Sequence, residues 1–226
     1  MEIHPIAIIR TDFPEKFGIP RQSGLAASLQ ARIVFEPQFR NHDALRGLED
    51  FSHIWLIWEF SANRRQEGEW QPTVRPPRLG GNKSMGVFAT RSPFRPNPLG
   101  LSCVELEGIE YDGPEGPVML VRGADLMDGT PIYDIKPYIR YADSRPHAVC
   151  GYVEELKERS LKVVLPHDVA EKVSDKTKLP ALLQTLGLDP RPSYHDDPER
   201  VYGLSFAGMN VRFSVSDGVL AVLDIE

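Results

Sequence analysis

The residues best suited to bind an anionic ligand are five cations in one proline-rich stretch, Pro72 to Gly100. This stretch contains no acid, and its cations are Arg75, Arg78, Lys83, Arg91 and Arg95. Prolines at positions 72, 76, 77, 93, 96 and 98 exclude a helix and disfavour a central strand. Guanidinium groups on so stiff a backbone indicate a rigid loop that presents donors to phosphate or carboxylate. The alternative, a surface loop with solvated charges, ranks second.

The chain is acidic as a whole and basic in one region. Its 226 residues carry a formal net charge of -6. Between Arg64 and Arg95 there are seven Lys and Arg against two Glu, a local charge of +5. A basic patch on an acidic body steers an anionic polymer such as RNA to one face. Trp70 and Phe94 lie among these polar and basic residues and are the best candidates for stacking on bases.

The other reactive side chains favour structural roles. The six histidines have no metal-binding spacing, so we expect no metal. Cys103 lies mid-strand between apolar neighbours, which favours a small core residue over a nucleophile. Cys103 and Cys150 are far apart and suit a reducing cytoplasm. No apolar run approaches the ~20 residues that span a bilayer, and the N-terminus lacks a signal-peptide pattern, so we expect no membrane contact.

The first part of the chain reads as short strands separated by turns. Phe51–Phe60 is the strongest, and its nearly continuous apolar run predicts burial on both faces, with Trp55 and Trp58 in the core. Asn41–Leu48 reads as one short helix capped by Asn41. The other predicted strands are Ile3–Arg10, Ala31–Phe35, Met85–Thr90, Gly100–Gly108, Val118–Arg122 and the end of Asp125–Tyr138. Many short strands without a glycine-rich dinucleotide loop indicate a barrel or sandwich.

After about residue 142 the pattern of short strands gives way to a mixture of predicted helices and strands, and we take this point as the domain boundary. Residues 1–142 are expected to form the β domain, and residues 143–226 a small α+β domain. The predicted helices are Pro166–Ser174 and Leu179–Leu186. The predicted strands are Leu161–Leu165, Val201–Ala207, Asn210–Val215 and Val219–Asp224, the last two joined by a tight turn.

Several long motifs together resemble the TrmO family of bacterial tRNA methyltransferases. They are PRQ (Pro20–Gln22), RGLEDFSHIW (Arg46–Trp55), TVRPPRLGG (Thr73–Gly81), GVFATRSPFRPNP (Gly86–Pro98) and DLMDGTPIYDIKPY (Asp125–Tyr138). The resemblance extends into the last third of the chain. It implies a mainly β fold, an N-terminal single-sheet β-barrel with a C-terminal α+β domain, and a homodimer.

The resemblance also implies an S-adenosylmethionine-dependent enzyme. Its substrate is expected to be the threonylcarbamoyl adenosine at position 37 of threonine tRNAs, which it methylates at N6. The cofactor site implied by matching positions comprises Arg21, Gln22, Ser61, Ala62, Arg91, Leu101, Asp128, Gly129 and Thr130. Ser61–Ala62 departs from the His-Gln of a family relative, so a backbone contact is expected there in place of a side-chain contact.

The expected reaction needs a proton acceptor near the adenine amine, and tRNA binding needs cationic side chains. An acceptor near N6 helps because the adenine amine is a weak nucleophile, and we assign this role to Asp134 or to a backbone carbonyl near Asn97. A purely structural role for the Asp134 carboxylate is an equal alternative. Arg75, Arg78 and Arg95 are assigned to RNA phosphates and to the threonyl carboxylate, and Asn97 completes the substrate-binding set.

Two other functions remain open at this point. One is a non-catalytic RNA-binding barrel that has lost cofactor binding, and the Ser61–Ala62 departure is its only support. The other is an S-adenosylmethionine-dependent enzyme that acts on a small metabolite. The local charge of +5 favours RNA as the substrate.

Overall fold

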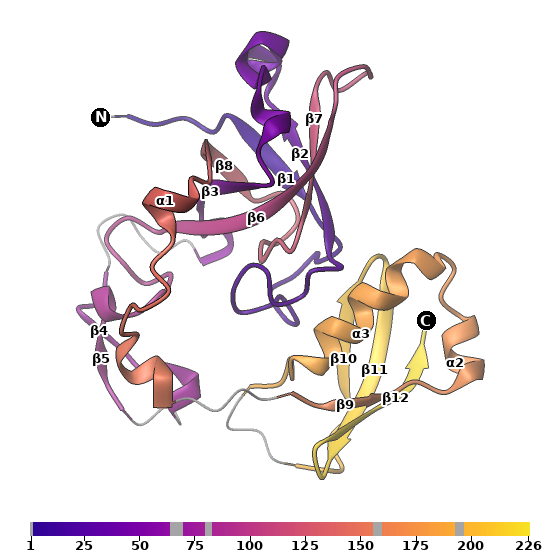
Figure 1. Cartoon of the computed structure of the whole chain (residues 1–226). Helices are drawn as coiled ribbons and strands as arrows, with labels where there is room; N and C mark the ends of the chain where they lie inside the picture. The colour runs from indigo at the N-terminus through magenta and orange to yellow at the C-terminus, as the bar shows by residue number, and fades with distance from the viewer. Residues whose placement is uncertain (1, 64–69, 80–82, 156–159, 193–196) are drawn as a thin grey trace.

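The chain folds into a closed six-stranded barrel followed by a smaller α+β domain (Figure 1). The computed structural model describes residues 2–63, 70–79, 83–155, 160–192 and 197–226. The barrel order is β1-β2-β7-β6-β3-β8, and all neighbouring strands are antiparallel. The strands are β1 (Ala7–Arg10), β2 (Gln30–Phe35), β3 (His53–Glu59), β6 (Leu99–Glu110), β7 (Val118–Arg122) and β8 (Pro131–Pro137). The predicted mainly β class and the barrel are confirmed.

Strand β3 shows which side chains form the core of the barrel. Ile54, Leu56 and Trp58 are buried inside, whereas the residues between them are partly exposed. The prediction that this strand is buried on both faces is wrong. A barrel wall has one inner face, so successive side chains alternate between the core and the outside. On the outside, the Trp55 indole donates a hydrogen bond to the Asp143 carboxylate at 3.1 Å.

Two predicted elements are shorter and tighter than expected. Asn41–Leu48 is not one helix, because Gly47 adopts a left-handed φ of 83° and separates two 3-10 turns, η2 (His42–Leu45) and η3 (Leu48–Asp50). Asn41 does cap η2, since its side chain accepts from the Asp43 N–H at 2.9 Å. Of Met85–Thr90, only β5 (Met85–Gly86) is strand, paired with β4 (Thr73–Val74). The rest forms the 3-10 turn η6 (Val87–Ala89), which the Thr90 N–H closes onto the Val87 carbonyl.

The remaining short elements link these strands. They are the 3-10 turns η1 (Pro37–Phe39), η4 (Ser61–Asn63), η5 (Pro77–Leu79), η7 (Gly151–Glu155) and η8 (Lys176–Lys178), and the one-turn helix α1 (Arg140–Asp143). None of the helices in the described ranges is long and apolar enough to cross a membrane.

The C-terminal domain is a four-stranded sheet with two helices, as predicted. The sheet order is β10-β11-β12-β9, with β9 parallel to β12 and the other pairs antiparallel. The strands are β9 (Lys162–Val164), β10 (Tyr202–Phe206), β11 (Met209–Ser216) and β12 (Val219–Ile225), and the helices are α2 (His167–Glu171) and α3 (Leu179–Gly187). Leu182 and Leu186 of α3 are fully buried in this domain's own core.

The loop between β1 and β2 packs into that second core, although it belongs to the barrel by sequence. Phe13 is buried there, and its ring meets the ring of Phe206 edge-on, with centroids 5.3 Å apart. Ala26 and Leu29, near the end of the loop, belong to the same cluster. Gly18 lies against Leu204, leaving no space for a side chain. The second domain therefore holds the β1–β2 loop in place.

Polar contacts reinforce this junction. The Asp12 carboxylate pairs with Lys178 at 2.8 Å, and its carbonyl accepts from the Ala207 N–H at 2.8 Å. The Ser28 N–H donates to the Gln184 side chain at 2.9 Å. The division at residue 142 stays a prediction, and these contacts show that the two cores share one connecting loop.

Candidate active site at one end of the barrel

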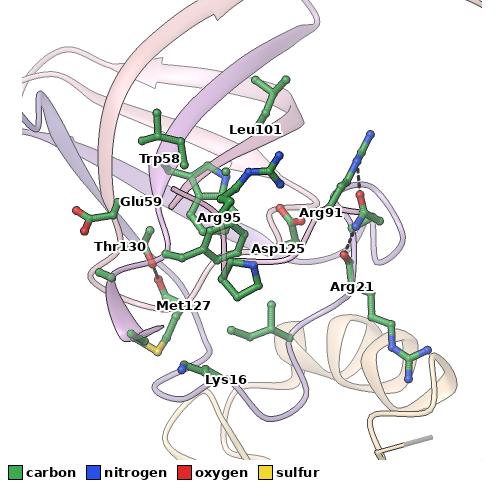
Figure 2. A pocket seen from close by; sticks show the side chains of 18 of the residues that line it. Lys16, Arg21, Trp58, Glu59, Arg91, Arg95, Leu101, Asp125, Met127 and Thr130 are labelled. Carbon is green, nitrogen blue, oxygen red and sulfur yellow. Dashed lines mark hydrogen bonds between the residues drawn. The ribbon is translucent and has the colours of Figure 1, made fainter. Parts of the chain in front are cut away.

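A cavity of about 540 Å³ opens at one end of the barrel. The end of β3, the start of β6, the segment between β7 and β8, and the β1–β2 loop all contribute to its lining (Figure 2). Apolar walls come from Ile19, Trp58, Phe60 and Leu101. This volume lies within the ~300–1,000 Å³ typical of small-molecule pockets. The cavity is therefore large enough for a nucleoside-sized ligand.

The structure brings seven of the nine predicted cofactor residues together in this cavity. They are Arg21, Gln22, Ser61, Ala62, Arg91, Leu101 and Thr130. The segments that carry them are far apart in the chain and meet only through the barrel closure and the packed β1–β2 loop. A shared cavity is what a single bound ligand requires.

The other two predicted cofactor residues, Asp128 and Gly129, form the adjacent turn and do not line the cavity. The Asp128 carboxylate accepts from the Thr11 N–H at 3.0 Å and pairs with Arg10 at 3.4 Å. Gly129 takes a left-handed φ of 74°, as the predicted turn requires. The Asp128–Gly129 turn shapes the approach to Thr130, whose hydroxyl donates to the Met127 carbonyl at 2.7 Å.

Contacts between loops fix the cationic side of the cavity. The Arg91 guanidinium donates to the side-chain oxygen of Gln22, which joins the proline-rich stretch to the β1–β2 loop. The Arg21 guanidinium lies toward the C-terminal domain (Figure 2), where it donates to the Asp189 carbonyl at 3.4 Å. The side-chain carboxylate of Asp189 forms a buried ion pair with Arg191, with a closest distance of 2.8 Å.

Two predicted substrate-binding residues, Arg95 and Asn97, also line the cavity. One Arg95 nitrogen donates to the carbonyls of Thr90 and Ser92, at 3.1 and 3.4 Å. Arg75 lines a neighbouring hollow, to which Arg91 also contributes. Arg78 belongs to η5, and its side chain lies outside the described residues, as do residues 64–69 of the basic segment.

Next to this hollow, two exposed aromatic rings stack on each other. The Trp70 and Phe88 centroids are 6.2 Å apart, with an interplanar angle of 26°. Their exposed fractions are 44% and 72%, unusually high for such large apolar side chains. Trp70 was predicted as a stacking residue, and its neighbour in the structure is Phe88. Phe94 lines the hollow instead. The sequence interpretation missed Phe88 because Met85–Thr90 was expected to be a strand.

Sequence reasoning also missed Asp125, the carboxylate at the inner side of the cavity. Its Oδ1 accepts a hydrogen bond from the Ser102 hydroxyl at 2.6 Å. The Ser102 oxygen in turn accepts from the Trp58 indole N–H at 2.9 Å. Burial raises the pKa of Asp125, and the Ser102 hydrogen bond and the Arg91 charge oppose that rise. The available signal in the sequence was its place at the start of the Asp125–Tyr138 motif, three residues before the Asp128–Gly129 turn.

Asp134, the predicted proton acceptor, lies outside the cavity lining. Its carboxylate accepts from the backbone N–H of Ile135 at 2.9 Å and pairs with Lys136 at 2.9 Å. It lies on β8 opposite Ile57 of β3. This geometry fits the alternative of a structural carboxylate.

Cys103 and the histidines of the described residues do not line this cavity. Cys103 lies on β6, and burial followed by the Asp143 charge raises the pKa of its thiol, which keeps it protonated. Within the described ranges, no three His, Cys, Asp or Glu side chains are grouped to hold a metal ion.

Gly100 allows the cavity wall to form. A Cβ built at this position would lie 2.3 Å from Cε2 of the Trp58 indole. The ring thus packs directly on the β6 backbone, and its N–H reaches Ser102. A rigid ring in a closed barrel has little freedom to move aside.

We expect Gly100→Ala to lower the free energy of unfolding by about 1–3 kcal/mol, because the added methyl group displaces Trp58. Urea denaturation followed by tryptophan fluorescence measures the change. Gly108→Ala on the same strand is the matched control, since a Cβ there meets nothing within 4 Å. Equal stability of the two variants would contradict this packing.

Fold and site together define a class, namely β-barrel proteins with a cavity of small-molecule size at one end of the barrel and basic and aromatic residues nearby. Residues 8–144 match the family model described as the tRNA-methyltransferase O N-terminal domain. Residues 158–226 match the TrmO C-terminal domain. The chain belongs to the TrmO family, and the resemblance predicted from its motifs is confirmed.

Similar proteins span the whole chain. The tRNA (adenine(37)-N6)-methyltransferase of Escherichia coli is 39% identical over 232 residues, covering 100% of this chain and 97% of the relative. A Pseudomonas aeruginosa protein named a putative S-adenosylmethionine-dependent methyltransferase is 39% identical, covering 99% and 96%. The crystal structure of TrmO from Pseudomonas aeruginosa superposes with a TM-score of 0.77 at 32% identity, covering 100% of this chain and 98% of that one.

Proposed function

We propose that this protein transfers a methyl group from S-adenosylmethionine to N6 of adenosine 37 in tRNA. The observation that carries the proposal is the convergence of Arg21, Gln22, Arg91, Leu101 and Thr130 on one cavity in a TrmO family member. Relatives named tRNA (adenine(37)-N6)-methyltransferase and S-adenosylmethionine-dependent methyltransferase support the reaction and the donor.

The residues of the cavity fit the methyl donor. The apolar side chains of Ile19, Phe60 and Leu101 suit an adenine ring, and Arg91 with the Gln22 amide suits a carboxylate. Gly100 lets the Trp58 ring pack on the β6 backbone, and both residues line the cavity. When bound, S-adenosylmethionine supplies an activated methyl group on a sulfonium. The contribution of the protein is then chiefly to hold donor and acceptor in line.

We further propose that the substrate adenosine carries a threonylcarbamoyl group, in threonine tRNAs. Arg95 supports this, because it lines the cavity and a guanidinium pairs well with a free carboxylate. The stacked Trp70 and Phe88 rings support an anticodon-loop substrate, whose bases are splayed and available for stacking. Arg75 in the adjoining hollow is assigned to a phosphate.

Replacing Arg75 with alanine is expected to weaken tRNA binding and reduce its salt dependence, because Arg75 is assigned to a phosphate. Each lost phosphate contact lowers the slope of log K against log salt by about 0.7–0.9. Filter binding of tRNA from 50 to 200 mM salt measures this slope, with Arg212→Ala, at an exposed position of β11, as the control. A weaker affinity with an unchanged slope would contradict the assignment of Arg75 to a phosphate.

A homodimer in the cytoplasm is the expected working form. The resemblance to the family supports a homodimer, and the two free cysteines favour a reducing compartment. Light scattering of the purified protein measures its mass, and a single mass near 25.4 kDa would contradict the dimer.

The function is tested by nucleoside mass spectrometry of tRNA from cells that lack the protein. We expect one methyl group to be lost from threonylcarbamoyl adenosine, with all other modified nucleosides unchanged. Re-expression of the chain should restore it. An unchanged nucleoside profile would contradict the proposal.

A further inference from the structure

We propose that Asp125 accepts the proton that leaves N6 of the target adenosine, an inference that rests on the proposed function. Among the described residues that line the cavity, the carboxylates are Asp125 and Glu59. Glu59 turns away from the side chains grouped around Asp125 (Figure 2) and accepts a hydrogen bond from the Tyr133 hydroxyl at 2.6 Å. Asp125 is therefore the carboxylate that faces a bound ligand.

A directed hydrogen-bond chain keeps the Asp125 carboxylate ready to accept. The Trp58 indole N–H can only donate, so the Ser102 oxygen must accept from it. The Ser102 hydroxyl proton is then directed at Oδ1 of Asp125, at 2.6 Å. Oδ1 of Asp125 therefore accepts this hydrogen bond and carries no proton. Trp58 and Ser102 are both buried and come from adjacent strands, so the chain is rigid.

The surroundings tune the basicity of this carboxylate. Burial raises the pKa of Asp125, followed by opposing effects from Ser102, the backbone N–H groups of Asp125 and Ser23, and the Arg91 charge. The other charged groups lining the cavity are Arg21, Arg95, Lys16 and Glu59. A carboxylate with a raised pKa is a stronger base and moves toward the range in which a general base works best.

Methyl transfer forms one bond, breaks another and releases one proton. The N6 lone pair forms a bond to the methyl carbon, the carbon–sulfur bond breaks, and its electron pair stays on sulfur. N6 then holds one proton too many, because its lone pair has become a bond. Oδ2 of Asp125, the oxygen that the Ser102 hydroxyl does not contact, takes that proton and releases it to solvent through the open side of the cavity. The acceptor also holds the N6–H before transfer, which localises the lone pair of a weak nucleophile.

The test is Asp125→Asn under single turnover, with saturating S-adenosylmethionine and tRNA. We expect the rate to fall by about 10²–10⁴-fold, the usual contribution of a positioned base. Calorimetry should show unchanged affinity for S-adenosylmethionine. Asp43→Asn is the matched control, because the Asp43 carboxylate is exposed and does not line the cavity. This variant should keep the wild-type rate.

A stability measurement on the free protein gives a readout independent of activity. The pKa of Asp125 is raised by folding, so its ionisation costs stability as pH rises through the interval between the unfolded and folded pKa values. An amide carries no such cost. We expect Asp125→Asn to be as stable as wild type at neutral pH, or more stable, whereas a purely structural carboxylate would leave the variant destabilised.

Ser102→Ala tests whether the Ser102 hydrogen bond sets the pKa of Asp125 during catalysis. Because the Ser102 hydrogen bond lowers the pKa of Asp125, its loss should move the acidic limb of the pH–rate profile to higher pH. Wild-type rates with Asp125→Asn, or a loss explained entirely by weaker cofactor binding, would overturn the proposal. So would a rate loss in Asp134→Asn that spares Asp125→Asn. A wild-type protein that methylates no tRNA would instead refute the proposed function itself.

Discussion

Phe206→Ala is expected to lower the free energy of unfolding by about 3–5 kcal/mol, the usual cost of removing a buried phenylalanine ring. Phe206 is fully buried, and its ring meets Phe13 edge-on. Phe13 is the first core residue of the β1–β2 loop, which carries Arg21 and Gln22 into the cavity. Losing the ring therefore loosens the site as well as the C-terminal core.

Two measurements together test this link. Urea denaturation gives the stability, and calorimetry at a temperature where the variant is folded gives its affinity for S-adenosylmethionine, which we expect to weaken. Leu223→Ala is the matched control, because this β12 side chain is 46% exposed. Full cofactor affinity in a destabilised Phe206→Ala protein would mean that the loop does not need the second domain.

Arg91→Ala is expected to weaken S-adenosylmethionine binding by about 10–150-fold, the loss of a hydrogen bond to a charged group worth about 1.5–3 kcal/mol. Arg91 contacts Gln22 and therefore joins the proline-rich stretch to the β1–β2 loop. It also opposes the rise in the pKa of Asp125 that burial causes. Its removal should therefore both weaken binding and move the acidic limb of the pH–rate profile upward.

Calorimetry measures the affinity, and single-turnover rates against pH measure the second effect. Arg46→Ala is the control, since the Arg46 side chain is 79% exposed and forms its ion pair with Asp43, outside the cavity lining. Arg91→Lys keeps the charge but loses the fork geometry, so it should restore the pH profile better than the affinity. Wild-type affinity in Arg91→Ala would remove this residue from the cofactor site.

The strand pattern predicted a barrel or sandwich and most strands of both domains, because periodic apolar segments and turn residues are local signals. The choice of a barrel came from the family resemblance. Val118–Arg122 matches β7 residue for residue. The strand pattern failed where backbone geometry is set by single residues, as at Gly47, or by tertiary closure, as in β3. An apolar run alone cannot tell a strand with two buried faces from one in a barrel wall.

The site was predictable only in part. Motif resemblance named Arg21, Arg91 and Thr130, and the structure places all three at one cavity. Asp125 was not found, because its role depends on Ser102 and Trp58, which are distant in sequence and reach it only through strand pairing. The part that the C-terminal domain plays in holding the β1–β2 loop was equally invisible, since no local pattern assigns Phe13 to a core 190 residues away.

The most direct test of the central claim is methyl transfer in purified components. Protein, isotopically labelled S-adenosylmethionine and threonine tRNA, with and without the threonylcarbamoyl group, are incubated and the nucleosides analysed by mass spectrometry. We predict label on N6 of threonylcarbamoyl adenosine 37, and none in tRNA carrying another base at that position. Label on a different nucleoside, or no label while the tRNA binds normally, would contradict the account.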